Sequence, residues 1–367
     1  MITTKANISN VLQNLYFYKN EPISLVHFVT NRCNARCSFC FIDFDNPKTF
    51  KNELTVNEID KITKNLGPNL TNVNLTGGEP FARKEILDIA RCYFKNTNID
   101  SITMPSNGSL PLRMVKFSKS ISKEFPKKKV LISISIDDLP KQHAKIRKIP
   151  NLFEKAMKSY QSLKNISGNI MVNVAITCSH ENYKNVPKLY DTLKKDYKVN
   201  SITANIVRDE GVYKIPKNKK RKILKAYTYL TNKILEDYKN NNLKNYNSNT
   251  LEGRIVNKKN FMLYKIMKKQ YLKPYFTSTC HAGSLFGIIG SEGTIYPCEI
   301  LDKPLGNIRD FNYDFLSLWH NKKTLGVKNW IKKTDCHCTY DCAWSLNILG
   351  NIKYQPELIK SVFEKSW

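Results

Sequence analysis

The chain has 367 residues, of which 41% are hydrophobic, so it is long enough for one large domain with a sizeable core plus a smaller domain. Its formal net charge of +28 would attract acidic partners, such as a phosphorylated substrate, anionic lipid or nucleic acid, but does not choose among them. No apolar run approaches the ~20 residues of a membrane-spanning helix, and residues 1–20 have no apolar signal-peptide core, which together predict a cytoplasmic protein. In that reducing compartment, its ten cysteines are expected to bind metal instead of forming disulfides.

Strand and helix patterns alternate through residues 23–211, after a short lead-in at residues 1–22. Nearly continuous apolar runs predict strands at residues 24–30, 72–76, 101–104, 130–136, 171–177 and 201–206, with both faces of each strand covered. Helices are predicted at residues 83–94, 112–125, 152–163 and 183–197, and a capping box at Thr55 and Glu58 opens one more. Six such units predict an α/β fold with a parallel, right-handed sheet. They are too few for a closed eight-fold barrel but suit an open, partial (βα)6 barrel.

The composition changes at residues 212–276, which we predict to be a helical, basic connector. Its Ile223, Tyr227, Leu230 and Ile234 recur at helical spacing, and a basic run at residues 214–222 leads into that helix. We interpret the basic run as a solvated helix face, and the polar residues 240–250 as a loop. Residues 277–367 then form a small, cysteine-rich C-terminal domain.

Three cysteines follow the first strand in a C-x3-C-x2-C arrangement: Cys33, Cys37 and Cys40. A four-iron cluster prefers four thiolates, so three of them can hold three irons and leave the fourth iron open to a substrate or cofactor. The alternatives are a structural zinc site and a disulfide pair. Zinc prefers four ligands in paired C-x2-C form, and neither His27 nor Asp43 is spaced as the missing fourth ligand. A disulfide would need an exported chain.

This motif, with Phe39 before its third cysteine and Gly77-Gly78-Glu79-Pro80 at the end of the second strand, resembles the radical S-adenosylmethionine (SAM) enzymes. The resemblance implies a partial barrel of the radical SAM type and a [4Fe–4S] cluster that binds SAM. It also implies that residues 77–80 hold the amino group of SAM and that Phe39 lies near the adenine. Independently of the family, glycines at a strand end permit positive backbone angles and the close approach of main chain to a ligand.

The same resemblance extends to the ends of the third and fourth strands. Asn107, in Ser106-Asn107-Gly108, matches the loop after the third strand, and Ser135 and Asp137 match the stretch that contacts the SAM ribose and carboxylate. Arg147 is the natural carboxylate partner, because a guanidinium binds a carboxylate with two parallel hydrogen bonds. We interpret His143 as a surface histidine. All these residues follow the carboxyl ends of strands, where such barrels carry their chemistry.

A second group of cysteines lies near the C-terminus: Cys280, Cys298, Cys336, Cys338 and Cys342. Their C-xn-G-x4-C and C-x3-C patterns resemble the SPASM or twitch extension, which holds auxiliary iron–sulfur clusters. Full SPASM domains carry seven cysteines, so five favour one auxiliary [4Fe–4S] cluster. Cys280, Cys298 and Cys342 match its ligands best, and either Cys336 or Cys338 completes the four. A structural zinc site is the alternative.

Four further residues stand outside these motifs, and three of them have two interpretations each. Glu299 follows Cys298 directly and matches the acidic residue that takes a proton from substrate in anaerobic sulfatase-maturating enzymes, although glutamate also occurs there without that role. Arg208, after the sixth strand, is either a binding group for an acidic substrate or a solvated arginine. Cys92 and Cys178 are interpreted as buried thiols, with contact to substrate as the alternative for Cys178.

The resemblance implies an enzyme that cleaves SAM reductively and abstracts hydrogen from a substrate carbon, so that it acts as an oxidoreductase or maturase. We expect it to oxidise or cross-link a peptide or protein side chain, with help from the auxiliary cluster and a flavodoxin- or ferredoxin-like electron donor. The alternative substrate is a sugar, aminoglycoside or lipid-linked small molecule. An alternative of another class is a non-catalytic iron–sulfur or zinc protein that binds nucleic acid, which the residues 77–80 loop makes unfavourable.

Overall fold

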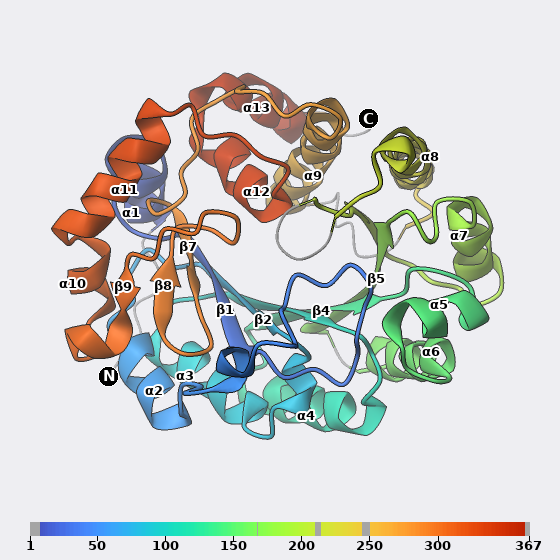
Figure 1. The fold of residues 1–367 in the computed structure, drawn as a ribbon, viewed down its shortest axis with the longest axis horizontal. Coiled ribbons are helices and arrows are strands. Elements are labelled where there is room, and N and C mark those ends of the chain that lie inside the picture. The colour runs from blue at the N-terminus through green and yellow to red at the C-terminus, as the bar shows by residue number, and fades with distance from the viewer. Residues whose placement is uncertain (1–7, 167, 210–213, 244–249, 364–367) are drawn as a thin grey trace.

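The computed structural model describes residues 8–166, 168–209, 214–243 and 250–363. Within these ranges, a curved nine-stranded sheet runs through the molecule in the order β6-β5-β4-β3-β2-β1-β7-β8-β9. Helices lie around the outside of this curve, as Figure 1 shows. None of the described helices combines the length and the apolar character that a membrane crossing requires.

The first six strands are parallel neighbours in chain order, as the alternating pattern predicts. They are β1 (Ser24–Thr30), β2 (Asn72–Gly77), β3 (Ser101–Ser106), β4 (Lys129–Ser135), β5 (Ile170–Cys178) and β6 (Ile202–Ile206). Every predicted strand is confirmed, with ends displaced by no more than two residues. Six consecutive parallel strands with helices on one side form the predicted α/β partial barrel.

The helices that follow these strands also occur where the sequence places them. The α-helices are α1 (Ile8–Gln13), α2 (Val56–Thr63), α3 (Ile86–Asn96), α4 (Pro111–Glu124), α5 (Pro140–Arg147), α6 (Leu152–Lys164), α7 (Val186–Lys195), α8 (Lys220–Lys239), α9 (Leu251–Gln270), α10 (Phe315–Trp319), α11 (Lys322–Lys333), α12 (Asp341–Gly350) and α13 (Gln355–Phe363). The capping box of α2 is confirmed, because the Thr55 hydroxyl accepts from the Glu58 amide and the Glu58 carboxylate accepts from the Thr55 amide. The predicted apolar face of α8 is buried from Ile223 to Ile234.

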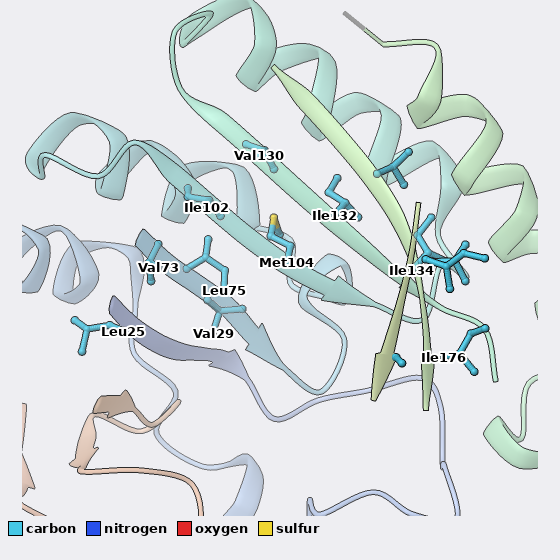
Figure 2. Close-up of a cluster of buried hydrophobic side chains, with 14 of the residues drawn as sticks. Leu25, Val29, Val73, Leu75, Ile102, Met104, Val130, Ile132, Ile134 and Ile176 are labelled. Carbon is cyan, nitrogen blue, oxygen red and sulfur yellow. The ribbon is translucent and has the colours of Figure 1, made fainter. Parts of the chain in front are cut away.

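In β2, β3, β4 and β6, only one face of the strand is buried. Figure 2 shows side chains of this face, including Leu25, Val73 and Ile132, which are fully buried in a core shared with the outer helices. Burial alternates along β2, β3, β4 and β6, and the side chains of the opposite face, such as Thr103 and Ser133, are polar and partly exposed. The expectation that both faces are covered was therefore wrong for these strands, because the helices cover only the outer side of the curve.

Three strands of the C-terminal region continue the same sheet. They are β7 (Phe286–Ile289), β8 (Thr294–Tyr296) and β9 (Gly306–Asn307). β7 pairs in parallel with β1, with Ser24 opposite Phe286 and His27 opposite Ile289, and β8 and β9 follow antiparallel. The cysteine-rich region thus lies directly beside the strand that leads into the first cysteine motif. The predicted boundary at residues 211 and 212 lies outside the described residues, as do residues 1–7 of the lead-in and 244–249 of the predicted loop.

Candidate active site at the carboxyl ends of the strands

The first cysteine motif lies in the segment after β1, held against the C-terminal end of α5. The amides of Arg36 and Ser38 donate to the carbonyls of Arg147 and Ile146, at 3.1 and 3.2 Å. The side chains of Ile149 and Leu152 pack against Cys33 and Cys37. Backbone hydrogen bonds and apolar contacts thus fix the loop that carries the three thiols.

The first motif offers three half-buried thiols, which are donors of sulfur alone. Burial raises the pKa of Cys33 to about 11 and also raises the pKa of Cys37 and Cys40. At Cys37 and Cys40, the positive charge of Arg147 opposes this rise in pKa. Within the described ranges, no group of three or more His, Cys, Asp or Glu side chains converges closely enough to hold a single metal ion. Cysteine thiolates are the ligands that iron–sulfur clusters use, so the residues present fit such a cluster.

The glycines of residues 77–80 bring the end of β2 against the backbone that leads to Cys33. Gly77 has φ +138°, and a Cβ there would lie 1.9 Å from the Thr30 carbonyl oxygen. A Cβ on Gly78 would lie 2.2 Å from the Arg32 carbonyl oxygen. Backbone hydrogen bonds join the two segments: the Gly78 amide donates to the Thr30 carbonyl at 2.8 Å, and the Glu79 amide donates to the Arg32 carbonyl at 2.9 Å. The glycines are therefore required by contact between two segments of the chain.

The Glu79 carboxylate joins this loop to the loop after β3. It is 1% exposed and accepts from the Ser106 hydroxyl at 2.8 Å, the Asn107 amide at 2.7 Å and the Phe81 amide at 3.1 Å. Burial raises the pKa of Glu79, and these hydrogen bonds oppose that shift. The Asn107 side chain in turn donates to the Asn34 side chain at 2.9 Å and lies 4.0 Å from the Cys33 sulfur. Three predicted motifs thus meet at one place.

Asp137 and Arg147 form a buried ion pair, with 2.7 Å between Oδ2 and Nε. Burial alone would lower the pKa of Arg147, but Asp137 and the cysteine thiolates outweigh it and raise that pKa. The Arg147 guanidinium also lies 5.9 Å from the centre of the Phe39 ring. A guanidinium has five N–H donors, so the ion pair with Asp137 leaves further N–H donors of Arg147 for a ligand. Ser135, the last residue of β4, is partly exposed, and Asp137 lies two residues beyond the end of that strand.

His143 is not a surface histidine, and that interpretation was wrong. Its side chain is fully buried, and Nδ1 accepts from the Asp137 amide at 3.2 Å. Burial lowers its pKa to about 4, so the imidazole is neutral and positions the backbone that carries Asp137. Its position follows from α5, which turns back over the end of β4 and was absent from the sequence prediction.

The five C-terminal cysteines share one apolar cluster with Phe286, Ile331 and Tyr340. The amides of Leu301 and Tyr340 donate to the sulfurs of Cys298 and Cys338, both at 3.4 Å. The interaction between the neighbouring thiols of Cys280 and Cys336 raises the pKa of Cys280 and lowers that of Cys336. Burial raises the pKa of Cys342. All five predicted ligands therefore lie in or against one apolar cluster.

Arg208 and Glu299 form an ion pair that sequence reasoning missed. Their Nη2 and Oε2 atoms are 2.7 Å apart, and their side chains are only 21% and 14% exposed. The Arg208 guanidinium lies 4.9 Å from the Tyr340 ring centre and 5.7 Å from that of Phe41, the residue after Cys40. Burial raises the pKa of Glu299, and Arg208 opposes that shift. Arg208 is thus largely buried and paired instead of solvated, and it links the first cysteine loop to the C-terminal cysteines.

A chain of neutral side chains crosses the inner face of the barrel and was also missed. The Ser133 hydroxyl donates to the Asn173 side chain at 2.7 Å, and Asn173 donates to the Thr203 hydroxyl at 2.9 Å. The alternation of polar and apolar residues in the strands was the signal that pointed to it. Cys92 and Cys178 are buried thiols, as interpreted from the sequence.

Comparison with known proteins gives a family match within the barrel. Residues 28–193 match the family model of the Radical SAM superfamily. The Fe-coproporphyrin III synthase of Methanosarcina barkeri (strain Fusaro / DSM 804) is 23% identical over 183 residues, which are 50% of this chain and 43% of that protein. The GTP 3',8-cyclase of Actinobacillus pleuropneumoniae serotype 7 (strain AP76) is 33% identical over 101 residues, or 27% of this chain and 30% of that protein. The chain spans less than half the length of these curated relatives.

Solved structures share the fold over most of the chain. Native anSMEcpe with bound AdoMet superposes with a TM-score of 0.61 at 19% identity, covering 93% of this chain and 97% of that one. Streptococcus suis SuiB bound to precursor peptide SuiA superposes with a TM-score of 0.55 at 16% identity, covering 88% of this chain and 69% of that one. The shared fold includes the C-terminal cysteine-rich region.

Proposed function

The chain belongs to the radical SAM superfamily, and from this premise we propose that it is an oxidoreductase or maturase that oxidises or cross-links a peptide or protein side chain. The superfamily consists of enzymes that use a [4Fe–4S] cluster and SAM, so the alternative of a non-catalytic binding protein is set aside. When bound, the cluster and SAM supply a 5′-deoxyadenosyl radical that takes hydrogen from a carbon which protein side chains cannot activate.

The observation that carries this proposal is the meeting of three separate segments around the first cysteine motif. Cys33, Cys37 and Cys40 would hold the cluster. The SAM site would be built from nine residues: Phe39, Gly77, Gly78, Glu79, Pro80, Asn107, Ser135, Asp137 and Arg147. Glu79 and Asn107 connect the loops after β2 and β3 to the cysteine segment, and Arg147 supplies positive charge beside the thiols.

We assign the auxiliary cluster to Cys280, Cys298, Cys342 and Cys336. The proximity of the Cys280 and Cys336 thiols, which interact with each other, supports Cys336 over Cys338 as the fourth ligand. Four cysteines also suit zinc, so metal analysis of the purified protein has to distinguish iron with sulfide from zinc.

Glu299 is our candidate for the group that accepts a proton from the substrate. It lies beside Cys298 and is largely buried, and its ion pair with Arg208 favours the charged, proton-accepting carboxylate against burial, which raises the pKa of Glu299. In this assignment Arg208 positions the base and does not bind substrate.

Two features support a peptide substrate. The chain shares its fold with anSMEcpe, whose structure was also solved with a bound peptide, at a TM-score of 0.58 and 19% identity. It also shares its fold with SuiB, which was solved with its precursor peptide. A cytoplasmic location and a flavodoxin- or ferredoxin-like electron donor complete the proposal.

Mass spectrometry of peptides from cells that produce the chain tests the reaction. We expect one peptide to lose two hydrogen atoms in cells with the intact chain and to keep them in cells with the Cys33→Ala/Cys37→Ala/Cys40→Ala variant. If the modified molecule is instead a sugar or another small molecule, the peptide assignment is wrong while the radical chemistry stands.

A further inference from the structure

We propose that one side of the molecule is a docking surface for a membrane that contains anionic lipids. Three segments form this α13 surface: η1 (Asn14–Tyr18) with Lys19, residues 272–276 after α9, and η6 (Ile352–Tyr354) with α13. In Figure 1, α13 lies at the top edge of the molecule and α4 at the bottom edge. The inference does not depend on the proposed function, because it uses none of the residues assigned to the clusters, to SAM or to the substrate.

The α13 surface exposes large apolar side chains. Ile352, Phe17 and Phe363 are 84%, 79% and 78% exposed, and five more are between 42% and 66% exposed: Tyr18, Leu272, Tyr275, Phe276 and Ile359. These eight are half of the large apolar side chains that are exposed in the described part of the chain. Single exposed apolar residues are ordinary, but a group of them marks an interaction site.

Hydrogen bonds between the three segments bring these side chains to one side of the molecule. The Tyr16 hydroxyl donates to Gln355 Oε1 at 2.9 Å and joins η1 to the start of α13. Lys353 Nζ donates to the Thr277 carbonyl at 2.9 Å and joins η6 to the end of the segment after α9. The exposed residues therefore belong to one surface, although they are far apart in sequence.

One face of α13 continues this surface. Gln355, Ile359 and Phe363 are spaced four residues apart and therefore lie on the same face of the helix. Gln355 contacts η1 at one end of this face, whereas Ile359 and Phe363 are exposed along the rest of it. Leu358 and Ser361 are buried and hold the helix in place. The outer apolar residues of α13 are thus not needed to anchor it.

A lysine directly follows an exposed apolar residue in each segment. The pairs are Tyr18-Lys19, Leu272-Lys273, Ile352-Lys353 and Ile359-Lys360. Glu357 is the one acidic residue in the three segments, and it is paired with Lys258 of α9 at 3.7 Å. Segments that bind at a membrane surface combine apolar side chains, which enter the acyl boundary, with lysines that reach anionic headgroups. The α13 surface has both components.

The same residues argue against other partners. Nucleic acid bases stack on aromatic rings, but the aliphatic side chains of Leu272, Ile352 and Ile359 offer no stacking surface. A second copy on this surface would bring the same lysines together, because a twofold interface pairs identical surfaces. A bilayer with anionic lipid instead neutralises the lysines and accepts the aliphatic side chains.

Co-sedimentation of the cluster-loaded protein with vesicles, without oxygen, tests the docking surface. Vesicles of phosphatidylcholine alone are compared with vesicles of an equal mixture of phosphatidylcholine and phosphatidylglycerol. We expect the natural chain to bind the mixed vesicles about tenfold more tightly or better, and added salt to weaken this binding. Phe17→Ser/Ile352→Ser and Lys273→Glu/Lys360→Glu should each weaken binding to the mixed vesicles about tenfold or more.

Matched controls on α4 make the same kinds of change at the other edge of the molecule. Leu112→Ser removes a leucine that is 81% exposed, and Lys116→Glu/Lys119→Glu reverses the charge of two exposed lysines. Both controls should bind the mixed vesicles as the natural chain does.

Three results would overturn the docking surface. The first is a natural chain that does not bind the mixed vesicles, and the second is an equal loss in the α4 controls, which would assign the binding to the net charge of +28. The third is another occupant: a dimer in light scattering, or a single-stranded oligonucleotide, that the α13-surface variants alone release. SAM cleavage with dithionite should be unchanged in every variant, so failure of the docking surface and failure of the proposed function are separate results.

Discussion

Replacing Arg208 with methionine isolates the ion pair that links the barrel to the C-terminal cysteines. Methionine keeps much of the side-chain length against Phe41 and Tyr340 but removes the charge that faces Glu299 at 2.7 Å. Removing one member of a buried pair leaves the other charge without compensation, at a cost of ~3–5 kcal/mol. Because both side chains keep some exposure, we expect the lower end, about 3 kcal/mol.

A double-mutant cycle separates the pair from the packing around it. Replacing both Arg208 and Glu299 with methionine removes both charges, and apolar residues of similar volume in place of a buried pair are often neutral in stability. We therefore expect the double variant to be more stable than Arg208→Met alone by about 2 kcal/mol or more. Anaerobic urea unfolding of the cluster-loaded protein measures each free energy of unfolding.

The same variant carries a pH signature. Burial raises the pKa of Glu299, and without Arg208 that rise is unopposed. A carboxyl whose folded pKa is raised binds more protons in the folded state, so its effect on stability worsens as pH rises above its unfolded value. Arg208→Met should therefore lose more stability at pH 8 than at pH 5. A cost below about 0.5 kcal/mol at both pH values, typical of an exposed pair, would refute this account of the ion pair.

Three further predictions follow from single contacts. Gly77→Ala should abolish iron binding at the first cysteine motif, because its Cβ would lie 1.9 Å from the Thr30 carbonyl oxygen, and an iron assay checks this. By contrast, Gly326→Ala in α11 has open space around its Cβ and should stabilise the chain by ~0.5–1 kcal/mol, as measured by urea unfolding. Burial lowers the pKa of His27 to about 3, so the free energy of unfolding should fall as pH drops below about 6.5. His27→Gln should reduce the slope of that free energy against pH by ~1.4 kcal/mol per pH unit. An unchanged slope would count against the burial of His27 as its cause. Cys336→Ser should lower auxiliary iron and sulfide while Cys338→Ser preserves them, and the reverse result would exchange the two roles.

Local sequence patterns predicted the barrel and the sites along each segment. The strands and the Thr55–Glu58 capping box depend on residues close in sequence, so the local sequence alone predicts them. Likewise, the Cys33 motif and residues 77–80 each follow a strand, and parallel strands bring their carboxyl ends to one edge. Their meeting at Cys33 could therefore be expected from order alone.

The long-range polar contacts could not be predicted in this way. Arg208 and Glu299 are far apart in sequence, and their pairing depends on β7 joining β1, which no local pattern announces. His143 appeared to be a surface residue because α5 is short and polar, with little helical periodicity of its own. The prediction for the inner face of the barrel was wrong although a local signal was present. Polar and apolar residues alternate in β2, β3 and β4, but these segments were interpreted as continuous apolar runs.

Reductive cleavage of SAM is the most direct test of the central claim. The protein is purified and reconstituted without oxygen, with Cys33, Cys37 and Cys40 intact or all changed to alanine, and 5′-deoxyadenosine, iron and sulfide are measured after adding dithionite and SAM. We predict that the intact chain forms 5′-deoxyadenosine and that the triple variant forms none while it keeps the iron of one cluster. An intact chain that carries both clusters but forms no 5′-deoxyadenosine, or C-terminal cysteines that hold zinc, would contradict the account.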